Sequence, residues 1–290
     1  MAADTPGSTV FYGGAIGQAI VQKKWSMPDV TKTHGPFWTK HLDKCSILLF
    51  LVLWELLPRL GGLLHTFVAP PSLVLKTLVV LFATGGLTKH IALSLFRATM
   101  GFVAAAAAGI PLGFFLGGGF RTLERLVNPL LLFLGHVNPF SLFPLFILLL
   151  GIGELSKGAM IFWVCLWPIL FSTVNGVKGI DPLLVKSARA TGAKITTLFF
   201  KVVLPAALPG IFHGLKMSAG TAFFMLIAAE MIGASSGLGW LVWNAQVNFQ
   251  IPRLFAATVV ISLLGLAINA LFEVLEAKLT GWKQQSVDQG

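Results

Sequence analysis

Two charged residues lie within long apolar stretches of the sequence. Arg97 follows His90 by seven residues, about 10 Å of helix, and Glu230 follows Lys216 by fourteen residues. An unpaired charge at membrane depth is costly, so each residue needs a partner or a function. One interpretation is that the two residues form an ion pair with each other. The other is that Arg97 snorkels and Glu230 ends its span at the interface.

The remaining reactive side chains form no recognisable catalytic or metal-binding motif. The six histidines are scattered, and Cys45 and Cys165 lie far apart without a CxxC pattern. The sequence contains no G-x-x-x-x-G-K-[ST] phosphate loop, no H-E-x-x-H and no G-x-S-x-G. We therefore expect no enzymatic activity and no cofactor on this chain. Any energy from ATP must come from another subunit, which would bind the ATP and Mg²⁺.

The composition predicts an all-α integral membrane protein. Of the 290 residues, 56% are hydrophobic and 11% are charged, and the mean hydropathy is +0.83. A helix needs about 20 apolar residues to cross a bilayer, and we predict about six such spans. They lie near 45–63, 90–118, 129–150, 158–177, 207–232 and 253–277. The apolar stretch 72–83 is shorter, which favours an interfacial or re-entrant segment.

The positive charges predict the orientation of these spans. Fourteen of the 21 Lys and Arg residues fall in segments on the same side as the N-terminus, and five fall on the other side. The positive-inside rule then places both termini in the cytoplasm, together with the segment 178–201. We divide the chain into a cytoplasmic N-terminal segment (1–44), a transmembrane domain (45–280) and a cytoplasmic C-terminal tail (281–290).

Small residues recur every four positions along the second predicted span. They are Gly101, Ala105, Gly109, Gly113 and Gly117. Such a track lies on one face of a helix and allows close approach of another helix. It predicts either simple helix packing or a moving, pore-lining face, and Pro111 within it predicts a kink.

A polar interruption separates the fourth and fifth predicted spans. Asp181 is a suitable N-cap, Pro182 suits the first helical position and Gly192 is a natural terminator, so a helix of roughly ten residues is expected. Its small side chains would let another protein's groove close on the backbone, and Leu184 and Val185 supply an apolar contact. A free helix of this length is marginal in water, which indicates that a partner holds it.

These residues resemble the cytoplasmic motif of inner-membrane permease subunits of binding-protein-dependent ABC importers. The motif reads Glu-Ala-Ala, three residues, Gly, nine residues, Ile-x-Leu-Pro. The chain has Lys186, Ser187, Ala188, Gly192, Val202, Val203, Leu204 and Pro205 at the same spacing, with departures at Lys186, Ser187 and Val202. The resemblance implies a coupling helix seated in a groove of a cytoplasmic ATPase. The coupling residues are then Asp181, Pro182, Leu184, Lys186, Ser187, Ala188, Arg189, Gly192, Leu204 and Pro205.

The resemblance covers roughly 45–280 and is strongest to the sulfonate, taurine, nitrate and bicarbonate branch. It rests on 69–72, 94–97, 109–113, 151–154, 204–209 and above all 229–240, whereas 135–141 departs from the branch and is where substrate preference would differ. It implies uptake of a small anion along a translocation path or gate. The residues we assign to that path are Arg97, Asn138, Glu230, Met231, Ser235 and Ser236.

The same resemblance implies a multi-pass protein of the bacterial cell (inner) membrane that works as a homodimer. Its partners would be two cytoplasmic ATPase subunits and a periplasmic or lipid-anchored substrate-binding protein. The run from Ser235 to Gly239 would be a flexible loop facing that binding protein. Three alternatives stay open at this point: a stand-alone secondary transporter or channel, an integral membrane enzyme, and a permease for a heterocyclic vitamin precursor.

Overall fold

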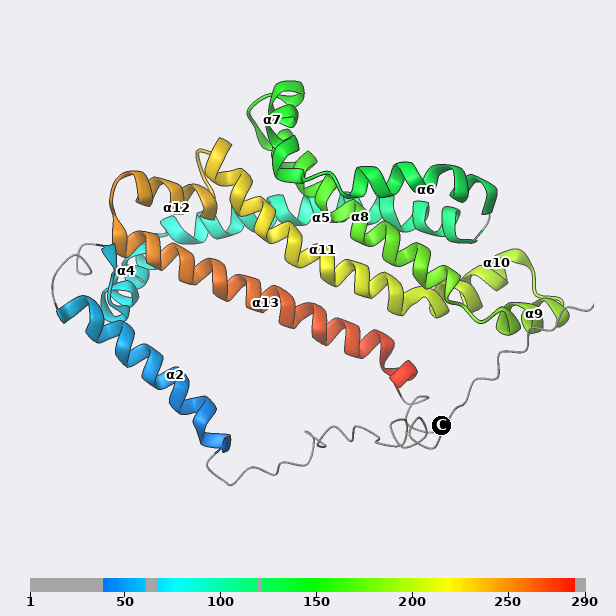
Figure 1. The fold of residues 1–290 in the computed structure, drawn as a ribbon, viewed down its shortest axis with the longest axis horizontal. Coiled ribbons are helices and arrows are strands. Elements are labelled where there is room, and N and C mark those ends of the chain that lie inside the picture. Colours follow the sequence, from blue (N-terminus) through cyan, green and yellow to red (C-terminus); the bar gives the residue numbers. More distant parts are fainter. Residues whose placement is uncertain (1–38, 61–66, 119–120, 285–290) are drawn as a thin grey trace, which may run out of the picture. The chain divides into compact units, whose positions relative to one another are not determined.

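The computed structural model describes residues 39–60, 67–118 and 121–284 (Figure 1). Within these ranges the regular structure is entirely helical, which agrees with the predicted fold class. Most of the predicted segment 1–44 lies outside the described residues. So do residues 61–63 of the predicted first span and residues 285–290 of the predicted tail.

The chain divides into two units, 1–53 and 54–290. The described part of the first unit belongs to helix α2 (Thr39–Leu56), which continues into the second. The second unit contains η2 (Leu57–Leu60), α4 (Pro71–Ala83), α5 (Gly86–Gly118), α6 (Arg121–Gly135), α7 (Pro139–Leu150), α8 (Glu154–Lys178), α9 (Pro182–Ala190), α10 (Ile195–Leu198), η3 (Phe199–Val203), α11 (Leu204–Gly233), α12 (Leu238–Val247) and α13 (Ile251–Gln284).

Four helices in the described residues are long and apolar enough to span a membrane. They comprise α5, α8, the continuous stretch Ile195–Gly233 and α13 as far as Leu279. The predicted third span, 129–150, is wrong as a single helix, because α6 and α7 meet at an angle of 90° across residues 136–138. If that bent pair is one span the number is five, so the count of six stays a prediction.

Helices α5 and α8 are parallel and pack through the predicted track of small residues. The residues that face each other keep a constant offset of 60 positions, from Gly101 opposite Ile161 to Gly117 opposite Val177. A Cβ atom added at Gly101 would lie 2.6 Å from Ile161 Cβ, so the backbones approach as closely as the side chains allow. The packing interpretation of the track is therefore confirmed.

Helix α8 also packs against α11, here in antiparallel orientation (Figure 1). Glycine again permits the contact, since a Cβ atom at Gly210 would lie 2.7 Å from Gly176 Cα, and one at Gly214 would lie 2.7 Å from Ser172 Cβ. Of the four long helices α8 is the most buried. In its apolar 18-residue stretch 56% is buried, against 17–28% in the others. Helix α8 is thus the centre of the bundle.

The fifth predicted span begins earlier than expected. We predicted 207–232, but α10, η3 and α11 form one continuous helical stretch from Ile195 to Gly233. Its η3 part is a π-helical turn that ends at Val203, two residues before Pro205 and six before Pro209. Proline lacks the N–H of a regular helical turn, so this stretch combines an irregular hydrogen-bond pattern with two prolines.

The close packing of α5 on α8 can be tested with Gly113→Ala. The added Cβ would lie 2.5 Å from Thr173 Cβ, which is fixed to the backbone, so the helices must move apart. We expect a loss of about 1–3 kcal/mol of stability, measured as a lower thermal unfolding midpoint of the purified protein. Gly220→Ala in α11 is the matched control, since its Cβ meets nothing within 4 Å. Equal midpoints for the two variants would contradict the tight contact.

Candidate functional site

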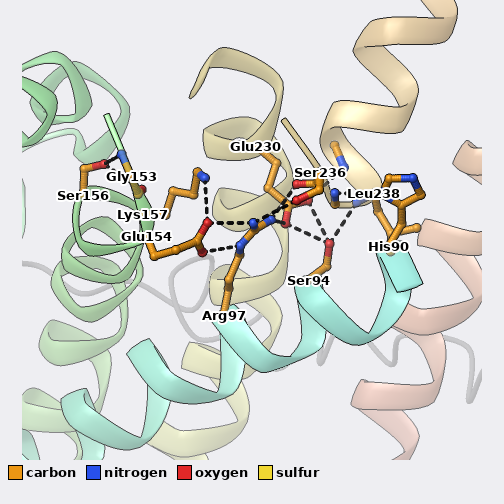
Figure 2. A network of polar contacts seen from close by, with 12 residues as sticks. His90, Ser94, Arg97, Gly153, Glu154, Ser156, Lys157, Glu230, Ser236 and Leu238 are labelled. Carbon is orange, nitrogen blue, oxygen red and sulfur yellow. Dashed lines mark hydrogen bonds and ion pairs between the residues drawn. The ribbon is translucent and has the colours of Figure 1, made fainter. Parts of the chain in front are cut away.

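A network of charged side chains joins α5, about three turns from its start, to the first turn of α8 and the last turn of α11 (Figure 2). Its centre is Arg97 of α5, whose Nη1 donates to Glu230 Oε1 of α11 at 2.7 Å. Both side chains are buried: Arg97 is 6% exposed and Glu230 is 0% exposed. The predicted contact between Arg97 and Glu230 is confirmed, and neither side chain snorkels to the surface.

Every N–H of the Arg97 guanidinium has an acceptor. Besides the bond to Glu230, Nη1 donates to the Ser236 carbonyl oxygen at 2.6 Å, and Nη2 donates to Ser236 Oγ at 3.3 Å. The remaining two donors, Nε and Nη2, bind the two oxygens of Glu154 at 2.5 and 2.8 Å. Arginine has five donors, so Arg97 has none left for an entering anion in this conformation.

The Glu230 carboxylate also caps helix α12. It accepts the Gly239 N–H at 2.9 Å and the Ser94 hydroxyl at 2.8 Å, while Ser94 Oγ accepts the Leu238 N–H at 2.9 Å. The Gly237 N–H donates to His90 Nδ1 at 2.9 Å, so this nitrogen carries no proton. The first N–H groups of a helix lack intrahelical partners and bear partial positive charge. Here residues of α5 and α11 supply both the acceptors and the compensating negative charge.

Glu154 and Lys157, at the start of α8, are members of the network that our list of path residues lacked. Lys157 Nζ lies 3.3 Å from Glu154 Oε1 and its side chain is only 4% exposed, whereas that of Glu154 is 64% exposed. Arg97 and Lys157 therefore balance Glu154 and Glu230 in charge. The sequence does contain a signal for them, because Glu154 and Lys157 have opposite charges at positions i and i+3, starting directly after Gly153.

The other predicted path residues are not all brought together. Ser236 belongs to the network, and Met231 and Ser235 follow Glu230 in the chain, with Met231 half-buried and Ser235 exposed. Asn138 lies elsewhere, as the N-cap of α7, where its side chain accepts the Phe140 N–H at 2.9 Å. Among the described residues, no three His, Cys, Asp or Glu side chains are placed to hold a metal ion.

The run between Ser235 and Gly239 differs from the flexible loop that we predicted. The Ser236 carbonyl and three successive N–H groups, from Gly237 to Gly239, are all bonded to side chains of α5 and α11. Gly237 has φ of +121°, and a Cβ there would lie 2.3 Å from the Glu230 carboxyl carbon. The glycines serve close approach to a buried carboxylate instead of mobility.

The polar interruption forms a second candidate site, the short helix α9. As predicted, the Asp181 side chain caps it by accepting the Leu183 N–H at 2.8 Å, and Pro182 occupies the first turn. Gly192 has φ of +76°, its N–H donates to the Arg189 carbonyl, and the Ala193 N–H donates to the Ala188 carbonyl. These two bonds are the Schellman pattern, so both helix ends are satisfied locally.

Helix α9 has a free outer face and an inner face above a cavity. None of its residues is buried, and Leu183 and Leu184 are 66% and 53% exposed. Pro182, Val185 and Arg189, spaced at three and four residues, line a cavity of about 1050 Å³ with the ends of α5 and α8 and with α6, α10 and η3. Of the other residues predicted to couple, Lys186 and Ser187 are exposed, and Leu204 and Pro205 start α11.

Residues 109–281 match the family described as "Binding-protein-dependent transport system inner membrane component". This region contains α6 to α12 and most of α13, and therefore α9 and three of the four charged members of the network.

Curated relatives match over most of the chain. The putative aliphatic sulfonates transport permease protein SsuC of Bacillus subtilis (strain 168) is 32% identical over 246 residues, 85% of this chain and 88% of the relative. The taurine transport system permease protein TauC of Escherichia coli (strain K12) is 30% identical, over 82% of this chain and 88% of the relative. The nitrate import permease protein NrtB of Leptolyngbya laminosa is 31% identical, over 69% and 71%.

Solved structures show the same fold. An inward-facing form of the MetNI methionine ABC transporter contains a chain with a TM-score of 0.55 and 20% identity, which covers 68% of this chain and 95% of that one. An amino acid ABC transporter crystallised with histidines gives 0.56 at 12% identity, over 69% and 97%. At these identities the likeness concerns the fold alone.

The contact between Gly237 and Glu230 can be tested with Gly237→Ala. The substitution forces an alanine to a φ that it rarely adopts, at about 1–3 kcal/mol, and drives its Cβ into the Glu230 carboxylate. We expect a marked drop in the thermal unfolding midpoint. Gly153→Ala, beside Glu154, is the control, because Gly153 has an extended backbone and open space around its Cβ position. A Gly237→Ala protein as stable as this control would argue against the observed geometry.

Proposed function

Because the chain belongs to the family of inner membrane components of binding-protein-dependent transport systems, we propose that α9 and the Arg97 network are the two control points of anion import. The chain is a permease subunit of an ABC importer, and ATP hydrolysis belongs to a separate ATPase subunit. Membership of this family excludes a stand-alone secondary transporter or channel and a membrane enzyme.

We infer the substrate class from the relatives. Permeases named for aliphatic sulfonates, taurine and nitrate are each at least 30% identical to this chain over two thirds of its length or more. Sulfonates and nitrate share one chemistry, a small group with several oxygens and a single negative charge. We propose that this permease imports a solute of that class, which favours the anion over a heterocyclic vitamin precursor.

Helix α9 is the proposed coupling helix, and its double capping is the observation that carries this assignment. A nine-residue helix is unstable on its own, yet α9 is closed at both ends and buries none of its residues against the rest of the chain. Leu183 and Leu184 then offer an exposed apolar face for the groove of an ATPase. Movement of the ATPase would act directly on α9.

The Arg97 network is the proposed outer gate. In the orientation that the positive-inside rule predicts, both termini and α9 are cytoplasmic, and α5 and α8 begin at the outer side of the bilayer. The network would then tie the outer ends of α5, α8 and α11 together. An outward-facing state would require the outer end of α11 to separate from the α5–α8 pair, so the network favours a closed outer side.

The proposed assembly has two copies of this permease and two ATPase subunits that bind ATP and Mg²⁺. A periplasmic or lipid-anchored binding protein would deliver the anion at the outer face of the bacterial inner membrane. ATP-driven closure of the ATPase pair would move the two α9 helices together and open the outer side. Each partner biases the same two-state bundle from an opposite face.

Leu184→Asp tests the coupling helix. Leu184 is 53% exposed, so the permease itself should fold normally. Burying a leucine in a partner's groove is worth about 1.5–3 kcal/mol, and its replacement should weaken ATPase binding about tenfold or more. Co-purification of the ATPase subunit with tagged permease measures the effect. Ile152→Asp is the control, because Ile152 is 79% exposed and precedes the opposite end of α8. Undiminished co-purification of Leu184→Asp would refute the assignment.

Stimulation of ATP hydrolysis tests the substrate class and the gate together. We expect the reconstituted complex to respond to binding proteins loaded with sulfonate, taurine or nitrate and not to proteins loaded with solutes that lack a sulfonate or nitrate group. Arg97→Gln removes the central cation of the network, so the outer end of α11 should separate from α5 and α8 more easily, and ATP hydrolysis should rise without any binding protein.

Two outcomes would contradict these assignments separately. Stimulation only by a vitamin-precursor binding protein would contradict the proposed anion substrate and would not bear on the proposed gate. If the Arg97→Gln complex assembles normally but still requires a loaded binding protein for ATP hydrolysis, the proposed gate is contradicted. The proposed substrate class is then unaffected.

A further inference from the structure

We propose that Arg97 and Lys157 form a binding site for a small oxyanion, and that the protein's own Glu154 carboxylate occupies this site in the present conformation. The geometry alone supports the site, and only the identity of its natural anion rests on the proposed function. Glu154 would act as a replaceable internal anion at the outer gate.

The contacts of Glu154 are those of a bound oxyanion. Its two oxygens lie 2.5 and 2.8 Å from Arg97 Nε and Nη2, and Lys157 Nζ lies 3.3 Å from one of them (Figure 2). A guanidinium binds planar or tetrahedral oxyanions through the same parallel pair of N–H groups. A nitrate, carboxylate or sulfonate group can therefore make the bonds that Glu154 makes.

Burial separates the replaceable carboxylate from the fixed one. Arg97 and Lys157 are 6% and 4% exposed, so water solvates neither cation well, whereas Glu154 is 64% exposed. Leaving this site costs Glu154 little solvation, because its carboxylate can move into water. Glu230 is fully buried and bonded to Ser94 and Gly239, so it cannot leave without breaking the α12 cap.

The rest of the network keeps the site assembled when Glu154 leaves. Three of the five Arg97 N–H bonds go to Glu230 and Ser236 and stay in place, which leaves the N–H pair aimed at the vacated position. A monovalent oxyanion carries the same charge as Glu154, so the network stays neutral. Because anion and carboxylate compete, the anion is bound weakly and can be expelled again.

The experiment uses the complete complex of permease and ATPase subunits in lipid nanodiscs, without binding protein, and sodium nitrate or methanesulfonate as the probe. Glu154→Ala vacates the site, so the variant complex should be less stable than the wild type. Adding the oxyanion should then raise its unfolding midpoint by about 2–4 °C, and this rise should saturate with concentration. Sodium chloride at equal ionic strength should produce no such rise. The double variant Glu154→Ala/Arg97→Gln should not respond to the oxyanions.

Glu55→Ala is the matched control within the same chain. Glu55 also pairs with an arginine, Arg59, but the Arg59 side chain is 58% exposed and remains solvated after the substitution. We expect no oxyanion-dependent rise for this variant. An equal rise in Glu55→Ala, or a rise retained by the double variant, would overturn the proposal.

A second measurement uses the wild-type complex and does not depend on the folding of any variant. A water-soluble carbodiimide labels accessible carboxylates, and mass spectrometry reports each site. Saturating nitrate should increase labelling of Glu154 several-fold and leave Glu55 unchanged, because only Glu154 is displaced. Unchanged labelling of Glu154 would overturn the proposal. A complex that passes both tests but imports no anion would instead refute the proposed substrate class.

Discussion

The full satisfaction of one buried guanidinium is the constraint on which this end of the bundle depends. Arg97 is surrounded by apolar helices, so each of its five N–H groups must find an acceptor within the protein. The acceptors come from α8, from α11 and from the segment before α12. Their positions fix where α8 begins, where α11 ends and how α12 is capped. The short Ser94 side chain and the glycines at 237 and 239 follow from the same requirement.

Local signals predicted a large part of this structure. The spacing of small residues predicted the face of α5 that meets α8, and an Asp-Pro start with a glycine stop predicted α9 almost to the residue. The cost of two charges in apolar surroundings made the contact between Arg97 and Glu230 one of two interpretations, and the structure shows this contact. Each of these predictions rests on a property of one segment or, for Arg97 and Glu230, on two opposite charges that lie in apolar stretches of the sequence.

The sequence reasoning failed where several segments act together. The break at 136–138 was missed because 129–150 is long and apolar enough to span, although Asn138 and Pro139 repeat the cap pattern of Asp181 and Pro182. Glu154 was not assigned to the path because exposed carboxylates at a helix start are common. Its role depends on Arg97, 57 residues away. The bonded loop before α12 was predicted to be flexible because glycine permits mobility and close approach equally.

The constant offset between α5 and α8 has a consequence for how the protein can change shape. Facing residues such as Gly101 and Ile161 interlock at four levels, so α8 can neither slide nor rotate on α5 without overlap of atoms. The two helices must therefore move as one rigid body, and α8 carries α9 close to one end and Glu154 at the other. Any hinge has to lie outside this pair. The π-helical turn at Phe199–Val203, with Pro205 and Pro209 behind it, is where the backbone can bend.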